Sequence, residues 1–186
     1  MSKTGLLVMD LQNVIVSRIS NRTDFIGRLQ NVMTIARAAT IPIIYVVVKF
    51  RPQFPEVSSR NKAFNALKTG GLSLQEGDPI VDIHIDLWPQ PNDIIVTKRR
   101  VGAFSGSDLE IVLRSLDIEH LVLMGISTSG VVLSTLRAAS DMDYKITVLA
   151  DCCFDQDPEV QKVLMEKVFP QQADVLFANQ WLEQIS

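Results

Sequence analysis

Two charged side chains come at the ends of short apolar segments. Asp10 follows the run 5–9, and Lys98 closes the segment 93–98. A third apolar run, 121–124, leads into a turn that begins at Gly125. Strand ends in an open α/β sheet meet in one crevice, so we expect these three positions to converge. A buried carboxylate beside an ammonium group is suited to acid–base catalysis, because desolvation and attraction together decide which group holds the proton.

The segment 125–135 combines small and hydroxyl residues with the start of a helical pattern. This pattern predicts a buried strand, a tight turn and a helix N-terminus, whose backbone N–H groups can hold an anionic or oxyanionic group. The hydroxyls of Ser127, Thr128 and Ser129 have no histidine base beside them in the sequence. We therefore interpret them as turn and capping groups rather than as nucleophiles.

Apolar runs alternate with helical periodicity along the chain, and Thr23 is expected to cap the first helix. Strands are expected over residues 5–10, 41–48, 93–98, 121–124, 145–150 and 175–177, the fifth ending at Asp151. Helices are expected over residues 23–40, 107–116, 129–142, 158–168 and 179–185. Such alternation specifies parallel strands joined by right-handed crossovers. The expected fold is α/β, a three-layer α/β/α sandwich with a mostly parallel six-stranded, Rossmann-like sheet in a single domain, residues 1–186.

The segment 49–90 interrupts this alternation. It is rich in proline and glycine, and only a helical turn near 62–67 is expected within it. Long inserts with little regular structure are uncommon unless they serve a function. We expect this one to serve a function, for example as a wall or lid of a site.

The composition argues against several classes of partner. The formal net charge is −3 and no dense cluster of Lys and Arg is present, so neither nucleic acid nor an anionic membrane is favoured. No stretch approaches the length of a transmembrane helix, and the expected location is the cytoplasm. The adjacent Cys152 and Cys153 are expected to be reduced, because vicinal disulfides are strained.

Three ordered motifs identify a resemblance. The segments 6–13 and 96–104, and the turn 125–128 with 132–139, resemble those of the isochorismatase-like hydrolases, a superfamily that also contains nicotinamidases and N-carbamoylsarcosine amidase. The resemblance implies a catalytic set of Asp, Lys and a nucleophilic Cys. Asp10 and Lys98 match the first two, whereas the cysteine position falls on Val131. Cys152 and Cys153 follow the fifth strand, away from the nucleophile position.

The resemblance leaves two functions open. Isochorismatases also lack the cysteine and hydrolyse a vinyl ether with an acid and water. By analogy, this chain is expected to hydrolyse a small carboxylated molecule by acid–base chemistry, with Asp10 as the acid and Lys98 orienting it. The alternative is a catalytically inactive ligand-binding or scaffold member, because the Val131 side chain cannot attack a carbonyl group.

The resemblance also suggests how a substrate is held. Arg100 matches an arginine that some members place near substrate carboxylates, although a surface or intersubunit salt bridge is an equal alternative. The other candidate substrate-binding residues are Gln12, Phe104, Ile126, Ser127 and Thr128.

Further expectations from the resemblance concern metal, assembly and backbone. Neither metal nor cofactor is expected, because the chain has Lys49-Phe50-Arg51 where nicotinamidases have an Asp-x-His metal motif. A homodimer or a larger homo-oligomer is expected. A cis peptide bond is expected at Ile126–Ser127.

Overall fold

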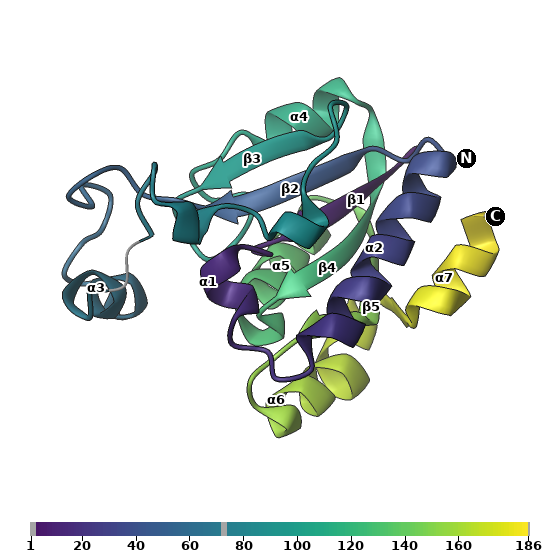
Figure 1. Ribbon diagram of the computed structural model, residues 1–186. Helices are drawn as coiled ribbons and strands as arrows, with labels where there is room; N and C mark the ends of the chain where they lie inside the picture. The colour runs from purple at the N-terminus through teal and green to yellow at the C-terminus, as the bar shows by residue number, and fades with distance from the viewer. Residues whose placement is uncertain (1–2, 72–73, 186) are drawn as a thin grey trace.

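The computed structural model describes residues 3–71 and 74–185, and in this part of the chain six strands form one parallel sheet (Figure 1). The order of the strands is β3-β2-β1-β4-β5-β6, and every neighbouring pair is parallel. The strands are β1 (Lys3–Met9), β2 (Ile43–Val48), β3 (Ile94–Lys98), β4 (Ile118–Ile126), β5 (Lys145–Phe154) and β6 (Asp174–Leu176). The predicted parallel sheet is confirmed.

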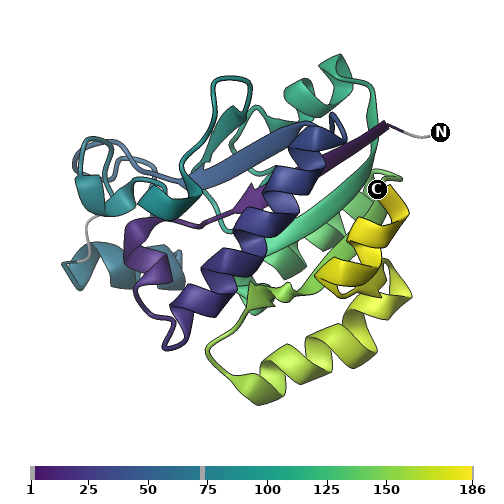
Figure 2. The ribbon, with the colours of Figure 1, turned by 45° about the vertical axis from the view of Figure 1, so that its right-hand side comes forward.

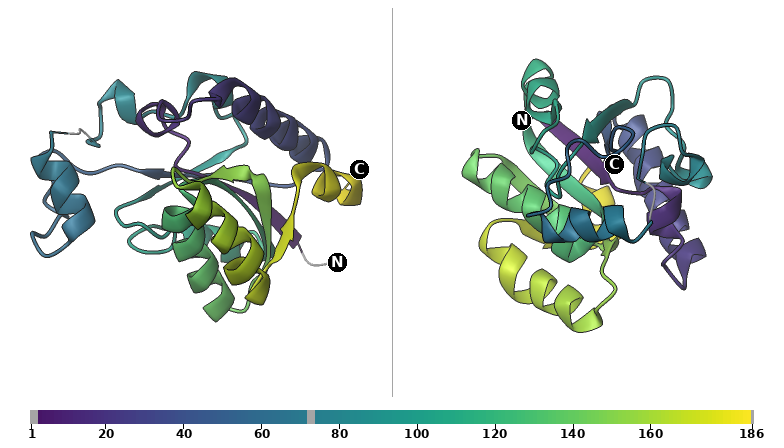
Figure 3. Two further views of the ribbon diagram at one scale, coloured as in Figure 1. Left: turned by 90° about the horizontal axis from the view of Figure 1, so that it is seen from below. Right: turned by 90° about the vertical axis from the view of Figure 1, so that its left-hand side faces the viewer.

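Helices cover both faces of this sheet (Figure 3). α2 (Arg22–Ala38) and α7 (Ala178–Ile185) pack against one face and contact each other, as Figure 2 shows. α4 (Leu109–Ser115), α5 (Leu133–Asp141) and the segment that starts with α6 (Pro158–Val163) pack against the other face. The three-layer α/β/α architecture is therefore as predicted.

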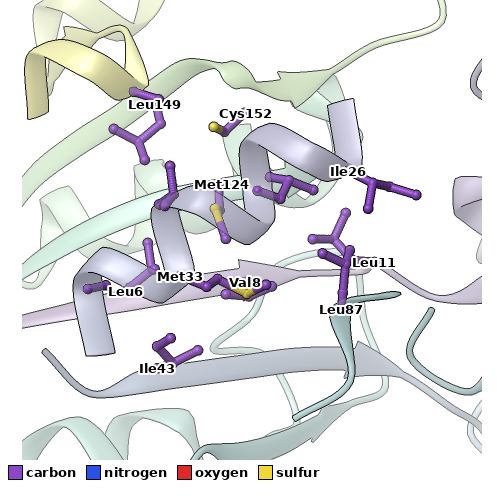
Figure 4. Packing of buried hydrophobic residues seen from close by; sticks show 14 of the residues in the cluster. Leu6, Val8, Leu11, Ile26, Met33, Ile43, Leu87, Met124, Leu149 and Cys152 are labelled. Atoms are coloured by element: carbon purple, nitrogen blue, oxygen red, sulfur yellow. The ribbon is translucent and has the colours of Figure 1, made fainter. Parts of the chain in front are cut away.

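The alternation of side chains along β1 explains why the sheet has two cores. Leu6 and Val8 belong to the apolar cluster under α2, whereas Leu7 and Met9 belong to the cluster on the opposite face. Figure 4 shows Leu6 and Val8 beside Met33 of α2. A strand that is buried on both faces has a continuous apolar sequence, which is the pattern that predicted it.

Details of β5 and α2 differ from the prediction, and the ladder between β4 and β5 is irregular. β5 continues to Phe154, so Asp151 lies inside the strand and not at its end. The ladder between β4 and β5 shifts register and then resumes with Gly125 opposite Cys153. Thr23 lies in the first turn of α2, which begins after Asn21, so it does not cap that helix.

The helix expected over residues 129–142 begins instead with a π-helical turn, 128–132, which leads into α5. The helix expected over 158–168 is α6 followed by a second π-helical turn, 164–168. Asp157 caps α6 by accepting hydrogen bonds from the backbone N–H groups of Glu159 and Val160. The four-residue helix α1 (Asn13–Val16) has no counterpart in the prediction, because four residues are too few to show a helical period.

The insert 49–90 forms a third apolar cluster beside the ends of β1 and β2. It contains α3 (Lys62–Thr69) and the 3-10 turns 79–81 and 85–87. Arg99, which follows β3, donates hydrogen bonds to the carbonyl of Lys49 and to Glu76, and it pairs with Glu56 at 3.3 Å. These contacts fasten the insert to the sheet edge.

None of the helices in the described ranges is long and apolar enough to cross a membrane.

Gly125 is required where β4 approaches β1. Its φ is +146°, and a Cβ at this position would overlap the carbonyl oxygen of Met9. We predict that Gly125→Ala lowers the free energy of unfolding by about 3 kcal/mol, because the new methyl group both clashes and strains the backbone. Urea denaturation measures the change.

Gly27 provides the control for this substitution. It lies on the exposed side of α2, and a Cβ there would have no atom within 4 Å. Gly27→Ala is expected to raise the free energy of unfolding by about 0.5–1 kcal/mol, because alanine favours a helix interior. An unchanged urea midpoint for Gly125→Ala would contradict the steric account.

Candidate functional site

Asp10 and Lys98 form an ion pair at the carboxyl edge of the sheet, with 2.9 Å between Oδ2 and Nζ. Asp10 directly follows β1, whereas Lys98 is the last residue of β3. In the sheet, β2 lies between β1 and β3. The Lys98 side chain must therefore span the end of β2 to reach Asp10. The predicted convergence is nevertheless present.

Both partners of this pair are almost fully removed from solvent, with 6% of Asp10 and 1% of Lys98 exposed. Lys98 Nζ also donates to the carbonyl of Arg100 at 2.9 Å. Asp10 Oδ1 is buried and has no hydrogen-bond partner within residues 3–71 and 74–185. The ammonium group thus has two acceptors, whereas one carboxyl oxygen remains available to a bound molecule.

Burial raises the pKa of the Asp10 carboxyl, and the nearby Lys98 ammonium group opposes this rise. The net direction is upward from the ordinary value of 3.8. Asp10 consequently keeps its proton to a higher pH than an exposed aspartate does. Such a carboxyl can serve as an acid.

A cavity of about 220 Å³ borders this pair. Its lining includes Val131, of which only 2% is exposed. The insert supplies Phe64, Leu67 and Leu74 to this lining. The other lining residues are Val14, Ile15, Arg18, Val48, Val101, Ile126, Ser127, Gly130, Phe154 and Gln156.

The turn after β4 contains the predicted cis peptide bond between Ile126 and Ser127. The sequence suggests that backbone N–H groups of this turn could hold an anion, but several of them donate hydrogen bonds within the protein. Ser129 N–H donates to the Asp155 carboxylate at 2.7 Å, while those of Gly130 and Val132 donate to the carbonyl of Ser127. These three donors are therefore not available to a ligand in this arrangement.

The predicted substrate-binding residues occupy different places. Ile126 and Ser127 line the cavity, and Thr128 is buried next to them with no described hydrogen-bond partner for its Oγ1. Gln12 is buried outside the lining. Its side-chain amide exchanges hydrogen bonds with the backbone of Val48 at 2.9 and 3.0 Å and donates to the carbonyl of Val81. Gln12 therefore joins β2 to the insert.

Arg100 and Phe104 also lie outside the described cavity lining. Arg100 is exposed and donates from Nη1 to the carbonyl of Arg99 at 2.6 Å. Phe104 packs near Tyr144, with 6.2 Å between the ring centroids. Of these two residues, Arg100 touches the Asp10–Lys98 pair, and it does so through its backbone carbonyl, which accepts from Lys98 Nζ.

The two cysteines lie within β5 and do not contribute to the described lining. Both are buried and unpaired with each other. Burial raises the pKa of Cys153 to about 12 and raises that of Cys152 as well. Both remain protonated at neutral pH, which disfavours them as nucleophiles.

Sequence reasoning missed Arg18 and Gln156, which both line the cavity. Arg18 comes just after α1, in a segment without periodicity, so no sequence signal indicated that it would lie near Asp10. Over the described residues, no three His, Cys, Asp or Glu side chains gather as candidate metal ligands.

Comparison with known proteins gives a consistent set of relatives. The isochorismatase domain family matches residues 4–180. Ureidoacrylate amidohydrolase RutB of Serratia proteamaculans is 33% identical over 178 residues, which cover 84% of this chain and 72% of that protein.

Solved structures agree with this match. An isochorismatase family protein from Burkholderia thailandensis is 27% identical with a TM-score of 0.84, covering 98% of this chain and 95% of the other. A cysteine hydrolase from Pseudomonas syringae pv. phaseolicola has a TM-score of 0.88 at 23% identity, covering 98% of this chain and 92% of the other. This second likeness shows the shared fold.

The Asp10–Lys98 pair leads to a prediction about stability. Asp10→Asn leaves the Lys98 ammonium group buried without a counter-charge, and Lys98→Met leaves the carboxyl group unpaired. Each single variant is expected to lose about 3 kcal/mol of unfolding free energy. The loss of unfolding free energy in the double variant should be about 2 kcal/mol smaller than the sum of the losses in the two single variants.

The exposed pair Glu110–Arg114 on α4 has a similar separation, 2.8 Å, and serves as the matched control. Its double-mutant cycle in urea should show almost no coupling, because solvent screens it. Equal coupling for the two pairs would show that burial does not govern the Asp10–Lys98 interaction.

Proposed function

The chain belongs to the isochorismatase family, and on this premise we propose that it hydrolyses a small carboxylated molecule by acid–base chemistry with water. The observation that carries the proposal is the buried Asp10–Lys98 pair beside a cavity, with Asp10 Oδ1 left without a protein partner. Asp10 is the proposed acid. Lys98 is proposed to hold its carboxyl group in place.

We further propose that the reaction uses no cysteine nucleophile. Counting along the turn motif places the nucleophile position of the family at Val131, whose side chain lines the cavity. The positions of Cys152 and Cys153 support this proposal, because both lie in β5 outside the described lining. Water then has to be the attacking group.

In the proposed reaction on an amide or ureide, the water oxygen bonds to the carbonyl carbon and the carbon–nitrogen bond breaks. The amine leaves with a proton from Asp10, and the proton released by water restores the carboxyl group. In a vinyl ether, Asp10 would protonate carbon, and water would add to the resulting cation and return a proton to the Asp10 carboxylate. The hemiketal formed in this way would then break its carbon–oxygen bond to give a carbonyl compound and an alcohol. A relative is named for ureidoacrylate, which carries a carboxylate and a urea group, so ureido acids are the first substrate class to test.

A further part of the proposal concerns the domain organisation, location and assembly of the protein. We propose that residues 1–186 form a single domain that acts in the cytoplasm without a cofactor, as a homodimer or a larger homo-oligomer. Exposed apolar side chains on and near the edge strand β3 support self-association. Ile95 is 53% exposed and Ile111 of α4 is 72% exposed.

The second candidate function is ligand binding without turnover. The observation that favours it is the apolar, buried Val131 side chain in the cavity lining. In this case the Asp10–Lys98 pair would hold a ligand and not transform it. Binding to the cavity with no hydrolysis of any compound in the panel below would favour this function.

The test of hydrolysis is turnover of a defined panel: 3-ureidoacrylate, 3-ureidopropionate, succinamate and a carboxylated vinyl ether. Asp10→Asn is expected to lower turnover at least about 100-fold, because it removes the proton donor. Asp143→Asn is the control, since Asp143 is exposed and has a similar positive φ. Alkylation with iodoacetamide should leave turnover by the parent protein unchanged.

The dependence of kcat on pH gives a second test of Asp10 as the acid. An acid must be protonated to act, so turnover should fall as pH rises through the pKa of Asp10. Burial raises this pKa, and the fall should therefore lie above the ordinary value of 3.8. Turnover that rises through this range, that is unaffected by Asp10→Asn, or that is lost on alkylation would contradict the proposed mechanism.

A further inference from the structure

Among the described residues that line the cavity, the charged types are Asp10, Lys98 and Arg18. The first two contact each other at 2.9 Å. Arg18 forms no ion pair with any residue in the described ranges 3–71 and 74–185. The positive charge of Arg18 therefore has no counter-charge among the described residues. A guanidinium group in this position is suited to bind a carboxylate by two parallel hydrogen bonds.

The backbone at Arg18 is held firmly. Its neighbours Val16 and Ile19 are both buried in the core under α2, and Ile19 N–H donates to the carbonyl of Val16 at 3.1 Å. Asn13, at the start of α1, binds the carbonyls of Pro79 and Asp82 through its side chain and backbone. This anchoring limits where the Arg18 side chain can reach.

The charged side chains that line the cavity differ in exposure, and this difference distinguishes two ends of the cavity. Asp10 and Lys98 are almost inaccessible, whereas Arg18 and Gln156 are exposed. Both exposed side chains line the cavity, so they belong to its mouth. Apolar side chains from α1 and α3, including Ile15 and Phe64, also line the cavity.

We propose that Arg18 binds the carboxylate of the substrate at the cavity mouth. The carboxylate is then separated by a short apolar segment from the group that reaches Asp10. This inference rests on the proposed function, because it takes the reaction to occur at the end of the cavity that contains Asp10. It specifies a substrate class: short chains with a carboxylate at one end and the hydrolysable group at the other.

The test is a binding measurement that involves no reaction. The probes are 5-oxohexanoate and 5-nitropentan-2-one, which differ by exchange of the carboxylate for a neutral nitro group of similar shape, and neither has a hydrolysable bond. Dissociation constants are measured by calorimetry at low salt. The proteins are the parent chain, Arg18→Gln, Arg18→Lys and the control Arg22→Gln, whose site is an exposed arginine at the start of α2.

The parent should bind the acid at least about tenfold more tightly than the nitro compound, and Arg18→Gln should abolish this preference. Arg18→Lys should retain part of it, because charge remains while the planar fork is lost. Arg22→Gln should leave it unchanged.

A parent without the preference, including one that binds neither probe, overturns the inference. A preference that survives Arg18→Gln, or that Arg22→Gln reduces equally, also overturns it. The proposed hydrolysis is judged separately by the effect of Asp10→Asn on turnover, so the two failures are distinguishable.

Discussion

The burial of Asp10 with Lys98 is the constraint on which the carboxyl edge of the sheet depends. Removal of either charge from water costs several kcal/mol, and attraction offsets part of this cost when the geometry is good. The 2.9 Å contact and the second bond from Lys98 to the carbonyl of Arg100 meet that condition. Both depend on the places where β1 and β3 end, on opposite sides of β2. The positions of these strand ends therefore define the chemistry of the site.

Other parts of the fold can be understood as support for this arrangement. Gly125 allows β4 to lie against Met9, the residue before Asp10. Arg99, the residue after Lys98, fastens the insert through Glu56 and Glu76. Contacts of the residues next to Asp10 and Lys98 thus join β4 and the insert to the edge of the sheet that carries the ion pair. Stability and the proposed function are coupled at this edge.

Sequence reasoning predicts an element correctly where its apolar pattern is long enough to indicate that the segment is buried. The strands and the positions of Asp10 and Lys98 at strand ends follow from apolar runs. Strand order does not, because the runs look alike and only tertiary packing places β2 between β1 and β3. Arg18 was missed because α1 is too short to show periodicity. Gln12 is predicted to bind substrate, but in the structure it donates hydrogen bonds to the carbonyls of Val48 and Val81. These residues are far from Gln12 in the sequence, so the sequence pattern does not reveal the contacts.

The most direct test of the central claim is the titration of Asp10 itself. The ¹³C shift of its side-chain carboxyl, assigned by its absence from Asp10→Asn, reports protonation without any substrate. The account predicts a midpoint above the ordinary pKa of 3.8, because burial outweighs the attraction of Lys98. A midpoint at or below this value would show that the ion pair dominates, and Asp10 could then not serve as the proposed acid.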